Sequence, residues 1–330
     1  MIELKNVSKI YGINTAVDNI SAKIEDGEIV GFLGPNGAGK STTMNMMTGY
    51  ISTTSGSIEI NGYDILKDAE KAKKLIGYLP ENPPLYIDMT VFEYLKFVYE
   101  LKNVKPEKNT QNIKEYREKH IDEIMSKVKI TSVKHRKIKN LSKGFKQRVG
   151  IAQALIGDPE VLILDEPTVG LDPNQIQDMR KLIRDLGKSR TVIISSHILS
   201  EITSVCTKVL IINNGKLVVY DTIKNINRQL VNQAVFVVRI AGDNTEIENS
   251  INSIDDVSEV VVSKTDEKGV WEYTITPVEG RIIKNKLIEM IYNKKMDLIS
   301  FESKKLTLED IFRKVTETRR KTATKKKGDN

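Results

Sequence analysis

The residues with the most specific chemistry lie in the stretch GPNGAGKST, residues 34–42. Gly34, Gly39, Lys40 and Ser41 have the spacing of a phosphate-binding loop, G-x-x-x-x-G-K-[ST]. In such a loop, backbone N–H groups and a helix N-terminus face a polyphosphate, the lysine neutralises its oxygens and the hydroxyl binds Mg²⁺. We therefore expect the chain to bind ATP or GTP through Gly34, Pro35, Asn36, Gly37, Ala38, Gly39, Lys40, Ser41 and Thr42.

Two carboxylates follow a second apolar run further along the chain, in VLILDEP, residues 161–167. Asp165 is placed to hold Mg²⁺, mostly through water. Glu166 can orient or deprotonate the water that attacks the nucleotide. The alternative is a pair of exposed acids at the end of a strand, without a catalytic role.

His197 ends a third apolar run, TVIISSH, residues 191–197, and is one of three histidines in the chain. A histidine in this position is often a surface residue or a satisfied core residue. Together with the phosphate loop and the acidic pair, however, a contact with the γ-phosphate is the better interpretation, so Glu166, His197 and Lys40 are the candidate catalytic residues.

These side chains need strands that end at one edge of a sheet. The runs IVGFL (29–33), VLIL (161–164) and TVIISS (191–196) predict buried strands, and the stretch after the phosphate loop predicts a helix that ends at Gly49. In an open α/β sheet, ligands bind outside the carboxyl ends of the strands, where all three sites would meet.

A further helix is predicted after Ser142, in the stretch NLSKGFKQRVGIAQAL, residues 140–155. Ser142 is a good N-cap, and a helix start of this composition is an anion site. The chain already has one phosphate site in its own loop. A second one is unexplained unless it serves another copy of the molecule.

The order GPNGAGKST, LSKGFKQR, VLILDEP, GLD and SSH resembles that of the nucleotide-binding subunits of ATP-binding cassette (ABC) transporters, over roughly residues 1–220. The resemblance implies an α/β P-loop NTPase cassette, with a mixed sheet core and a helical subdomain at about 90–158. It also implies a head-to-tail dimer in which Ser142 and Gly144 contact the γ-phosphate bound by the partner. By the same resemblance, Tyr11 would stack on adenine and Asp172 would link the two sites. Tyr11 could equally be an ordinary strand tyrosine.

Two positions depart from the family pattern. Glu81 stands where most cassettes have glutamine, and it can still bind Mg²⁺, so Ser41, Glu81 and Asp165 form the predicted metal site. In the signature, usually LSGGQ, the third and fifth residues are Lys143 and Phe145. With the C-terminal extension, this combination resembles the branch that energises exporters whose membrane subunits are separate chains.

Beyond residue 220 the pattern predicts strand, helix, strand, strand, helix and strand between residues 233 and 303, which is the order of ferredoxin-like α+β modules. This part contains no cluster of chemically active residues, so a regulatory or dimer-supporting role is expected. The predicted organisation is an ATPase domain at 1–220, an α+β domain at 221–317 that closes with a helix over 306–317, and a basic disordered tail at 318–330.

The composition of the chain limits the classes of protein to which it can belong. The net charge is +7, Cys206 is the only cysteine, and no apolar run approaches the roughly 18 residues of a membrane helix. We expect a cytoplasmic ATPase, peripheral on the cell membrane, that uses ATP and Mg²⁺, forms a homodimer and pairs with a separate multi-span membrane subunit. No specific nucleic acid is expected. The alternative is a soluble ABC-type ATPase that acts on ribosomes or DNA, which the basic pI of about 9.1 keeps open.

Overall fold

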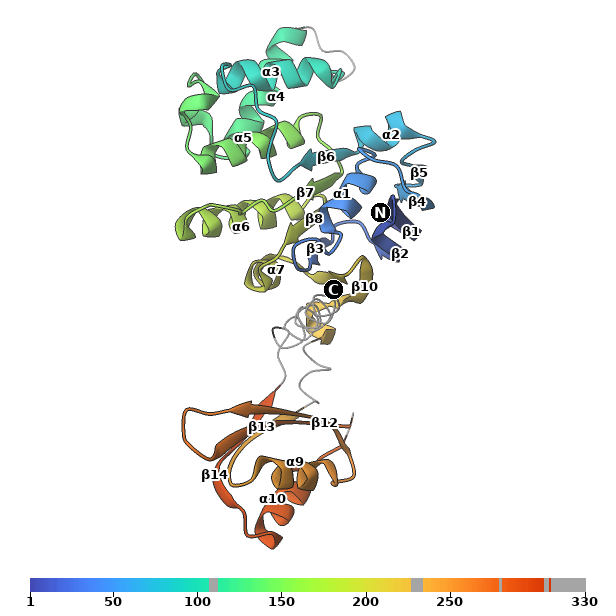
Figure 1. Cartoon of the computed structure of the whole chain (residues 1–330). Coiled ribbons are helices and arrows are strands. Elements are labelled where there is room, and N and C mark those ends of the chain that lie inside the picture. The colour runs from blue at the N-terminus through green and yellow to red at the C-terminus, as the bar shows by residue number, and fades with distance from the viewer. Residues whose placement is uncertain (107–111, 227–233, 279–280, 306–308, 310–330) are drawn as a thin grey trace. The chain divides into compact units, whose positions relative to one another are not determined.

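The computed structural model describes residues 1–106, 112–226, 234–278, 281–305 and 309 (Figure 1). The chain divides into two compact units, Met1–Ile223 and Lys224–Asn330. The sequence predicts a domain boundary slightly earlier, after Tyr220. The predicted closing helix over 306–317 and the basic tail lie outside the described residues, apart from Glu309.

A six-stranded sheet forms the centre of the first unit, in the order β10-β9-β3-β8-β7-β6. All neighbours pair in parallel except the edge pair of β9 and β10, which is antiparallel. The apolar runs predicted as strands form β3, β7 and β8 and are buried throughout, because both faces of a parallel sheet are covered. The strands are β3 (Ile29–Leu33), β6 (Ile76–Leu79), β7 (Val161–Leu164), β8 (Thr191–Ser196), β9 (Lys208–Asn213) and β10 (Lys216–Thr222).

A second, antiparallel sheet of the first unit has the order β2-β1-β4-β5. Its strands alternate between buried and exposed side chains, as in β1, where Ile2 and Leu4 are buried. These side chains share one hydrophobic core with the larger sheet and with the methionines of α1 (Lys40–Met47). The strands are β1 (Ile2–Tyr11), β2 (Asn14–Ile24), β4 (Ser55–Ile60) and β5 (Tyr63–Asp64).

Three helices of the first unit, α3 (Val91–Leu101), α4 (Ile113–Lys127) and α5 (Lys143–Leu155), pack against one another (Figure 1). Thr90 begins α3 with a capping box: its side chain accepts from the Glu93 N–H, and its own N–H donates to the Glu93 carboxylate at 2.8 Å. The first unit also contains α2 (Ala69–Lys74), α6 (Pro173–Gly187) and α7 (Leu199–Val205), with 3₁₀ turns at Thr131–Val133 and Ile138–Asn140.

The second unit has the predicted order of elements, and its sheet is antiparallel with strand order β12-β13-β11-β14. Both helices contribute to a separate core with Phe236, Val238, Tyr273 and Ile275 of the sheet. The unit is therefore a split βαβ module with a core of its own. Its elements are β11 (Ala234–Ala241), α9 (Asn244–Asn252), β12 (Val257–Lys264), β13 (Val270–Pro277), α10 (Lys284–Asn293) and β14 (Asp297–Lys305).

Cys206 lies directly after α7, where this helix packs against β3. A β-carbon on Gly31 would lie 2.3 Å from the Ile202 side chain and 3.1 Å from Cys206 Sγ, so glycine is needed for the close approach. The cysteine is buried, and burial raises the pKa of its thiol above the ordinary value.

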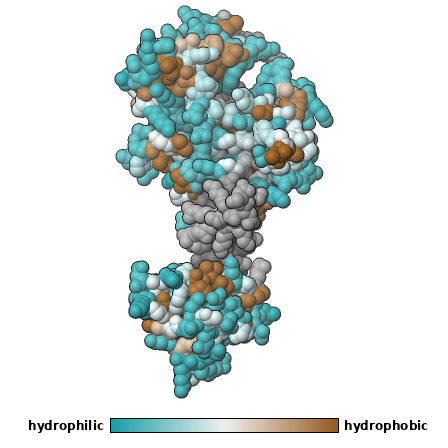
Figure 2. Space-filling model, viewed as in Figure 1, coloured by the Kyte–Doolittle hydropathy of each residue, from teal (hydrophilic) through white to brown (hydrophobic). Residues whose placement is uncertain are grey.

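In the described part of the chain, no helix is long and apolar enough to cross a membrane. Figure 2 shows that hydrophilic residues prevail on the visible face of each unit and that hydrophobic residues lie there in small groups.

Candidate active site

The phosphate loop connects β3 to α1 and depends on its glycines. Gly37 and Gly39 have φ values of 73° and 108°, a region that residues with a β-carbon rarely adopt. A β-carbon on Gly39 would lie 2.6 Å from Ala16 O, and one on Gly34 would lie 2.4 Å from Ile212 O. No side chain caps the start of α1, so its first N–H groups are available to an anion.

Lys40, the first residue of α1, is buried, and its ammonium faces the loop and the acidic strand end. Its Nζ donates to Gly34 O at 2.8 Å and to Pro35 O at 3.4 Å, and lies 3.8 Å from Glu166 Oε1. Burial lowers the pKa of Lys40, although the charges of Glu166, Asp165 and Glu81 oppose this shift. The lysine therefore carries its charge at a cost, which phosphate oxygens would offset.

The acidic pair Asp165 and Glu166 follows β7 and is buried. Ser195, on the neighbouring strand β8, holds both residues: its hydroxyl donates to Asp165 Oδ1, and its Oγ accepts from the Glu166 N–H at 2.8 Å. Glu166 has a φ of 47°, an uncommon left-handed conformation that is frequent at functional sites. This turn directs the two neighbouring carboxylates to different partners.

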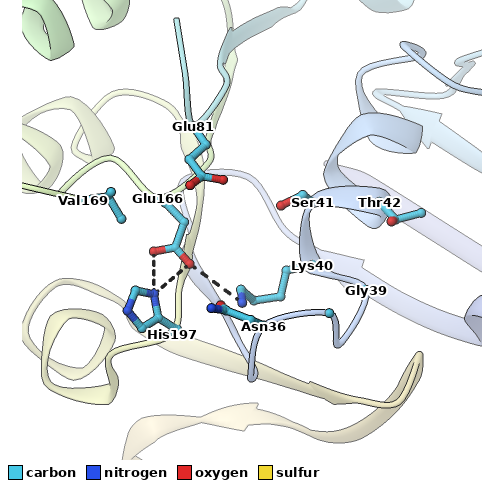
Figure 3. Close-up of a pocket in the computed structure, with 10 residues that line it drawn as sticks. Asn36, Gly39, Lys40, Ser41, Thr42, Glu81, Glu166, Val169 and His197 are labelled. Atoms are coloured by element: carbon cyan, nitrogen blue, oxygen red, sulfur yellow. Dashed lines mark hydrogen bonds and ion pairs between the residues drawn. The ribbon is translucent and has the colours of Figure 1, made fainter.

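His197 follows β8, and its ring lies beside the Glu166 carboxylate. Nδ1 is 3.1 Å from Oε2 and 3.2 Å from Oε1 of Glu166. Figure 3 shows the Glu166 carboxylate between the His197 ring and the Lys40 ammonium, with the Glu81 carboxylate nearby. A carboxylate held between a histidine ring and a lysine ammonium is well placed to polarise a water molecule.

These groups open into one cavity of about 450 Å³ over the phosphate loop. It brings together the predicted residues of the loop, the acidic strand end, the strand-end histidine and the Glu81 position. It is lined by Asn36, Gly37, Gly39, Lys40, Ser41, Thr42, Glu81, Glu166, Val169 and His197.

Four other predicted residues support this cavity from behind without lining it. Gly34 and Pro35 present their carbonyls to Lys40, and Ala38 is buried in the loop. Asp165 is buried and bonded to Ser195, so its carboxylate is fixed next to the cavity.

The remaining predicted residues lie away from the cavity lining within this chain. Tyr11 ends β1 half-exposed, with the Lys9 ammonium 5.2 Å from its ring centre. Ser142 caps α5 through the Phe145 N–H, and Asp172 caps α6 by accepting from the Gln175 N–H at 2.9 Å. A β-carbon on Gly144 would lie 2.4 Å from Gln175 Oε1, so that side chain covers the start of α5.

Two residues of the site were not predicted from the sequence. Val169 lines the cavity but has an ordinary apolar side chain, so its type carried no signal. Ser195 precedes the strand-end histidine and joins it to the acidic pair, which only the pairing of β7 with β8 reveals. A small polar residue directly after the apolar run of β8 was the available signal.

The comparisons with known proteins agree on one family. A family model described as ABC transporter matches residues 17–169. The chain is 42% identical over 230 residues to the uncharacterized ABC transporter ATP-binding protein YhcH of Bacillus subtilis, covering 69% of this chain and 72% of the relative. It is 41% identical over 234 residues to the bacitracin transport ATP-binding protein BcrA of Bacillus licheniformis, covering 69% of this chain and 73% of that relative.

Some relatives match nearly the whole chain. The linearmycin resistance ATP-binding protein LnrL of Bacillus subtilis is 32% identical over 320 residues, covering 96% of this chain and 98% of LnrL. Among solved structures, the dimeric post-hydrolysis state of the ATP-binding cassette MJ0796 bound to ADP and Pi matches with a TM-score of 0.60 at 25% identity, covering 67% of this chain and 98% of that one. The match confirms the predicted cassette fold.

Proposed function

The chain belongs to the family of ABC transporter ATP-binding proteins, and from that premise we propose that it drives export through a separate membrane-spanning subunit. As a member of this family it is an ATPase. Relatives named for bacitracin transport and linearmycin resistance support a role in moving compounds across a membrane. The names of YhcH and BcrA refer to a transporter or to transport, which favours the exporter over an ATPase that acts on ribosomes or DNA.

The placement of Glu166 between Lys40 and His197 is the observation that carries the chemical part of the proposal. Lys40 and the N–H groups of α1 would hold the β- and γ-phosphates. Glu166 would accept a hydrogen bond from the attacking water and polarise it, while His197 would orient this carboxylate and contact the γ-phosphate. Asn36, Gly37 and Thr42, which line the same cavity, would complete the phosphate site.

The donor set of the cavity fits Mg²⁺ bound together with ATP. In the described part of the chain, no three His, Cys, Asp or Glu residues cluster as a self-sufficient metal site. Magnesium usually takes only one or two protein oxygens and completes its shell with phosphates and water. Ser41, Glu81 and Asp165 would supply such oxygens from three elements, and the ion would neutralise charge on the transferred phosphate.

The exposed position of Ser142, away from its own chain's cavity, supports a head-to-tail homodimer. In this arrangement Ser142 and Gly144 would contact the γ-phosphate that the partner binds, Asp172 would lie near the junction of the two sites, and Tyr11 would stack on adenine. The second unit, which LnrL shares along almost its full length, would support or regulate this dimer. The assembly would lie on the cytoplasmic face of the membrane.

The decisive experiment for the active site is Glu166→Gln. The amide keeps the size of the side chain but is a poor base, so ATP affinity should stay within a few-fold while kcat falls by about 10²-fold or more. Binding of a fluorescent ATP analogue and steady-state phosphate release measure the two quantities. Near-normal turnover in a folded variant would remove Glu166 from its role.

The transport part of the proposal has a separate test. Affinity purification of the tagged chain from native membranes should recover a multi-span membrane protein, and co-reconstitution of the two in liposomes should give ATP-dependent transport. Recovery of ribosomal proteins or DNA in its place would contradict the exporter assignment.

A further inference from the structure

A buried carboxylate outside the cavity joins the two loops that carry Glu166 and His197. Glu201, in α7, is 8% exposed, and its Oε2 accepts two hydrogen bonds. The Thr168 hydroxyl donates at 2.7 Å, and the Ser196 hydroxyl donates at 2.8 Å. Thr168 and Ser196 are themselves buried.

The two donors lie next to the proposed catalytic pair on separate segments of the chain. Thr168 lies in the loop that follows β7 and Glu166, whereas Ser196 ends β8 directly before His197. The Ser196 Oγ also accepts from the Ile198 N–H at 3.0 Å, which fixes the backbone on the far side of His197. Glu201 is therefore a common acceptor for the segments whose side chains meet at 3.1 Å in the cavity.

The chemistry of this contact indicates a role beyond packing. Within the described residues, Glu201 forms no ion pair with a lysine, arginine or histidine; its bonds are to hydroxyls. Burying a carboxylate without a cation is costly, and an apolar residue would anchor α7 at lower cost. A charged acceptor does, however, form hydrogen bonds roughly twice as strong as a neutral one, which suits a contact that must fix two loops.

We propose that Glu201 is a positioning residue for ATP hydrolysis: it fixes the loop after β7 relative to the turn after β8, so that Glu166 and His197 stay in register. The inference rests on the roles proposed above for these two residues. Glu201 itself touches neither of them in the hydrogen-bond network, and it acts through Thr168 and Ser196.

The test compares Glu201→Ala and Glu201→Gln with Thr203→Val as a matched control. Thr203 lies on the same helix, and its hydroxyl bonds only to carbonyls of residues within that helix and at its start. Alanine removes the shared acceptor, so kcat should fall about 10- to 100-fold, the scale of a sub-ångström to ångström misplacement, while the KM for ATP changes less than about 3-fold. Glutamine keeps an oxygen in place and should restore kcat to within about 5-fold of the native value.

Thr168→Val, made alone and together with Glu201→Ala, separates a positioning role from a loss of stability. Thr168→Val removes one donor, and should lower kcat in the native background but not in the Glu201→Ala background, because the contact is already gone. Circular dichroism and thermal unfolding check that each variant is folded before its kcat is measured. Native kcat in folded Glu201→Ala, a glutamine variant as slow as alanine, or additive losses with Thr168→Val would each overturn the proposal.

Glu166→Gln, measured in the same assay, distinguishes failure of the positioning role of Glu201 from failure of the catalytic role of Glu166. An inactive Glu166→Gln protein beside a fully active Glu201→Ala protein overturns the positioning role alone. An active Glu166→Gln protein overturns both, since there would be no catalytic carboxylate to position.

Discussion

Ser195 forms two hydrogen bonds through one hydroxyl: it accepts from the Glu166 N–H and donates to the Asp165 carboxylate. Ser195 is fully buried, so a solvent water molecule could not take the place of its hydroxyl in these two hydrogen bonds. The left-handed turn at Glu166 therefore depends on one oxygen atom supplied by the neighbouring strand. Of the residues around the cavity, this serine is the one whose loss should damage fold and chemistry together.

Ser195→Ala should lower the free energy of unfolding by about 1–3 kcal/mol, the usual cost of leaving buried polar groups without a partner. Urea denaturation of the first unit or of the full chain measures the change. The control is Ser189→Ala, an exposed serine whose hydroxyl bonds to Leu186 O at 3.4 Å and whose loss should cost less than about 0.5 kcal/mol. Equal effects in the two variants would contradict the role of Ser195.

Glu81→Gln should leave basal ATPase activity within about 3-fold of the native value, because an amide oxygen can replace a carboxylate oxygen as a Mg²⁺ ligand. The Glu81 carboxylate also favours the charged form of Lys40, but it is a smaller influence on that pKa than Glu166 or Asp165. We expect a defect only in coupled transport, which vesicle uptake measures. A collapse of basal hydrolysis would show that Glu81 takes part in the chemistry.

At the scale of elements, His120 on α4 connects this helix to the end of α5. Its Nε2 accepts from the Gly157 N–H at 3.4 Å, and its ring contacts those of Tyr99 and Tyr116, with centroid distances of 5.6 and 6.5 Å. Burial lowers the pKa of His120 below the ordinary 6.5, although Asp158 and Glu123 oppose the shift. The folded state therefore holds this histidine neutral.

Stability should consequently fall as the pH drops below about 6.5. In that window the unfolded chain takes up a proton at His120 before the folded chain does, so the free energy of unfolding decreases with falling pH until the lowered folded pKa is reached. His120→Gln should remove this part of the acid dependence, measured as urea midpoints between pH 5 and 7.5. The native chain, measured in the same buffers, provides the control.

The elements also show what the sequence could predict. Continuous apolar runs such as IVGFL and VLIL identified β3 and β7 because strands buried on both faces need no alternation. The strand order of the sheet was not predicted, since local patterns do not encode which strands pair. For the same reason the links of Ser195 to Asp165 and of Glu201 to Thr168, each about 30 positions apart along the chain, emerged only from the structure.

At the scale of the whole molecule, the proposed dimer predicts complementation between two inactive variants. Ser142→Arg would place a bulky cation at the start of α5, and Lys40→Ala would remove the main countercharge of the phosphate loop. Each homodimer should be inactive, because both composite sites carry a lesion. In a mixed dimer both lesions can fall on one site, so mixing the proteins should recover part of the ATPase activity.

This experiment uses the membrane subunit where dimerisation requires it, and each variant alone is the control. If mixed dimers form but stay inactive, the two sites are strictly coupled or the trans assignment is wrong. A crosslink between Ser142→Cys and a cysteine in the partner's phosphate loop decides between these two explanations.

The buried Cys206 makes that crosslink simple to interpret. It is the only thiol in the chain, it packs against β3, and its raised pKa keeps it protonated at neutral pH, so it reacts slowly with thiol reagents. The natural protein is thus already a suitable host for site-specific labelling. A single cysteine introduced on its surface, and with it a fluorophore or spin label, would report one position without a cysteine-free background.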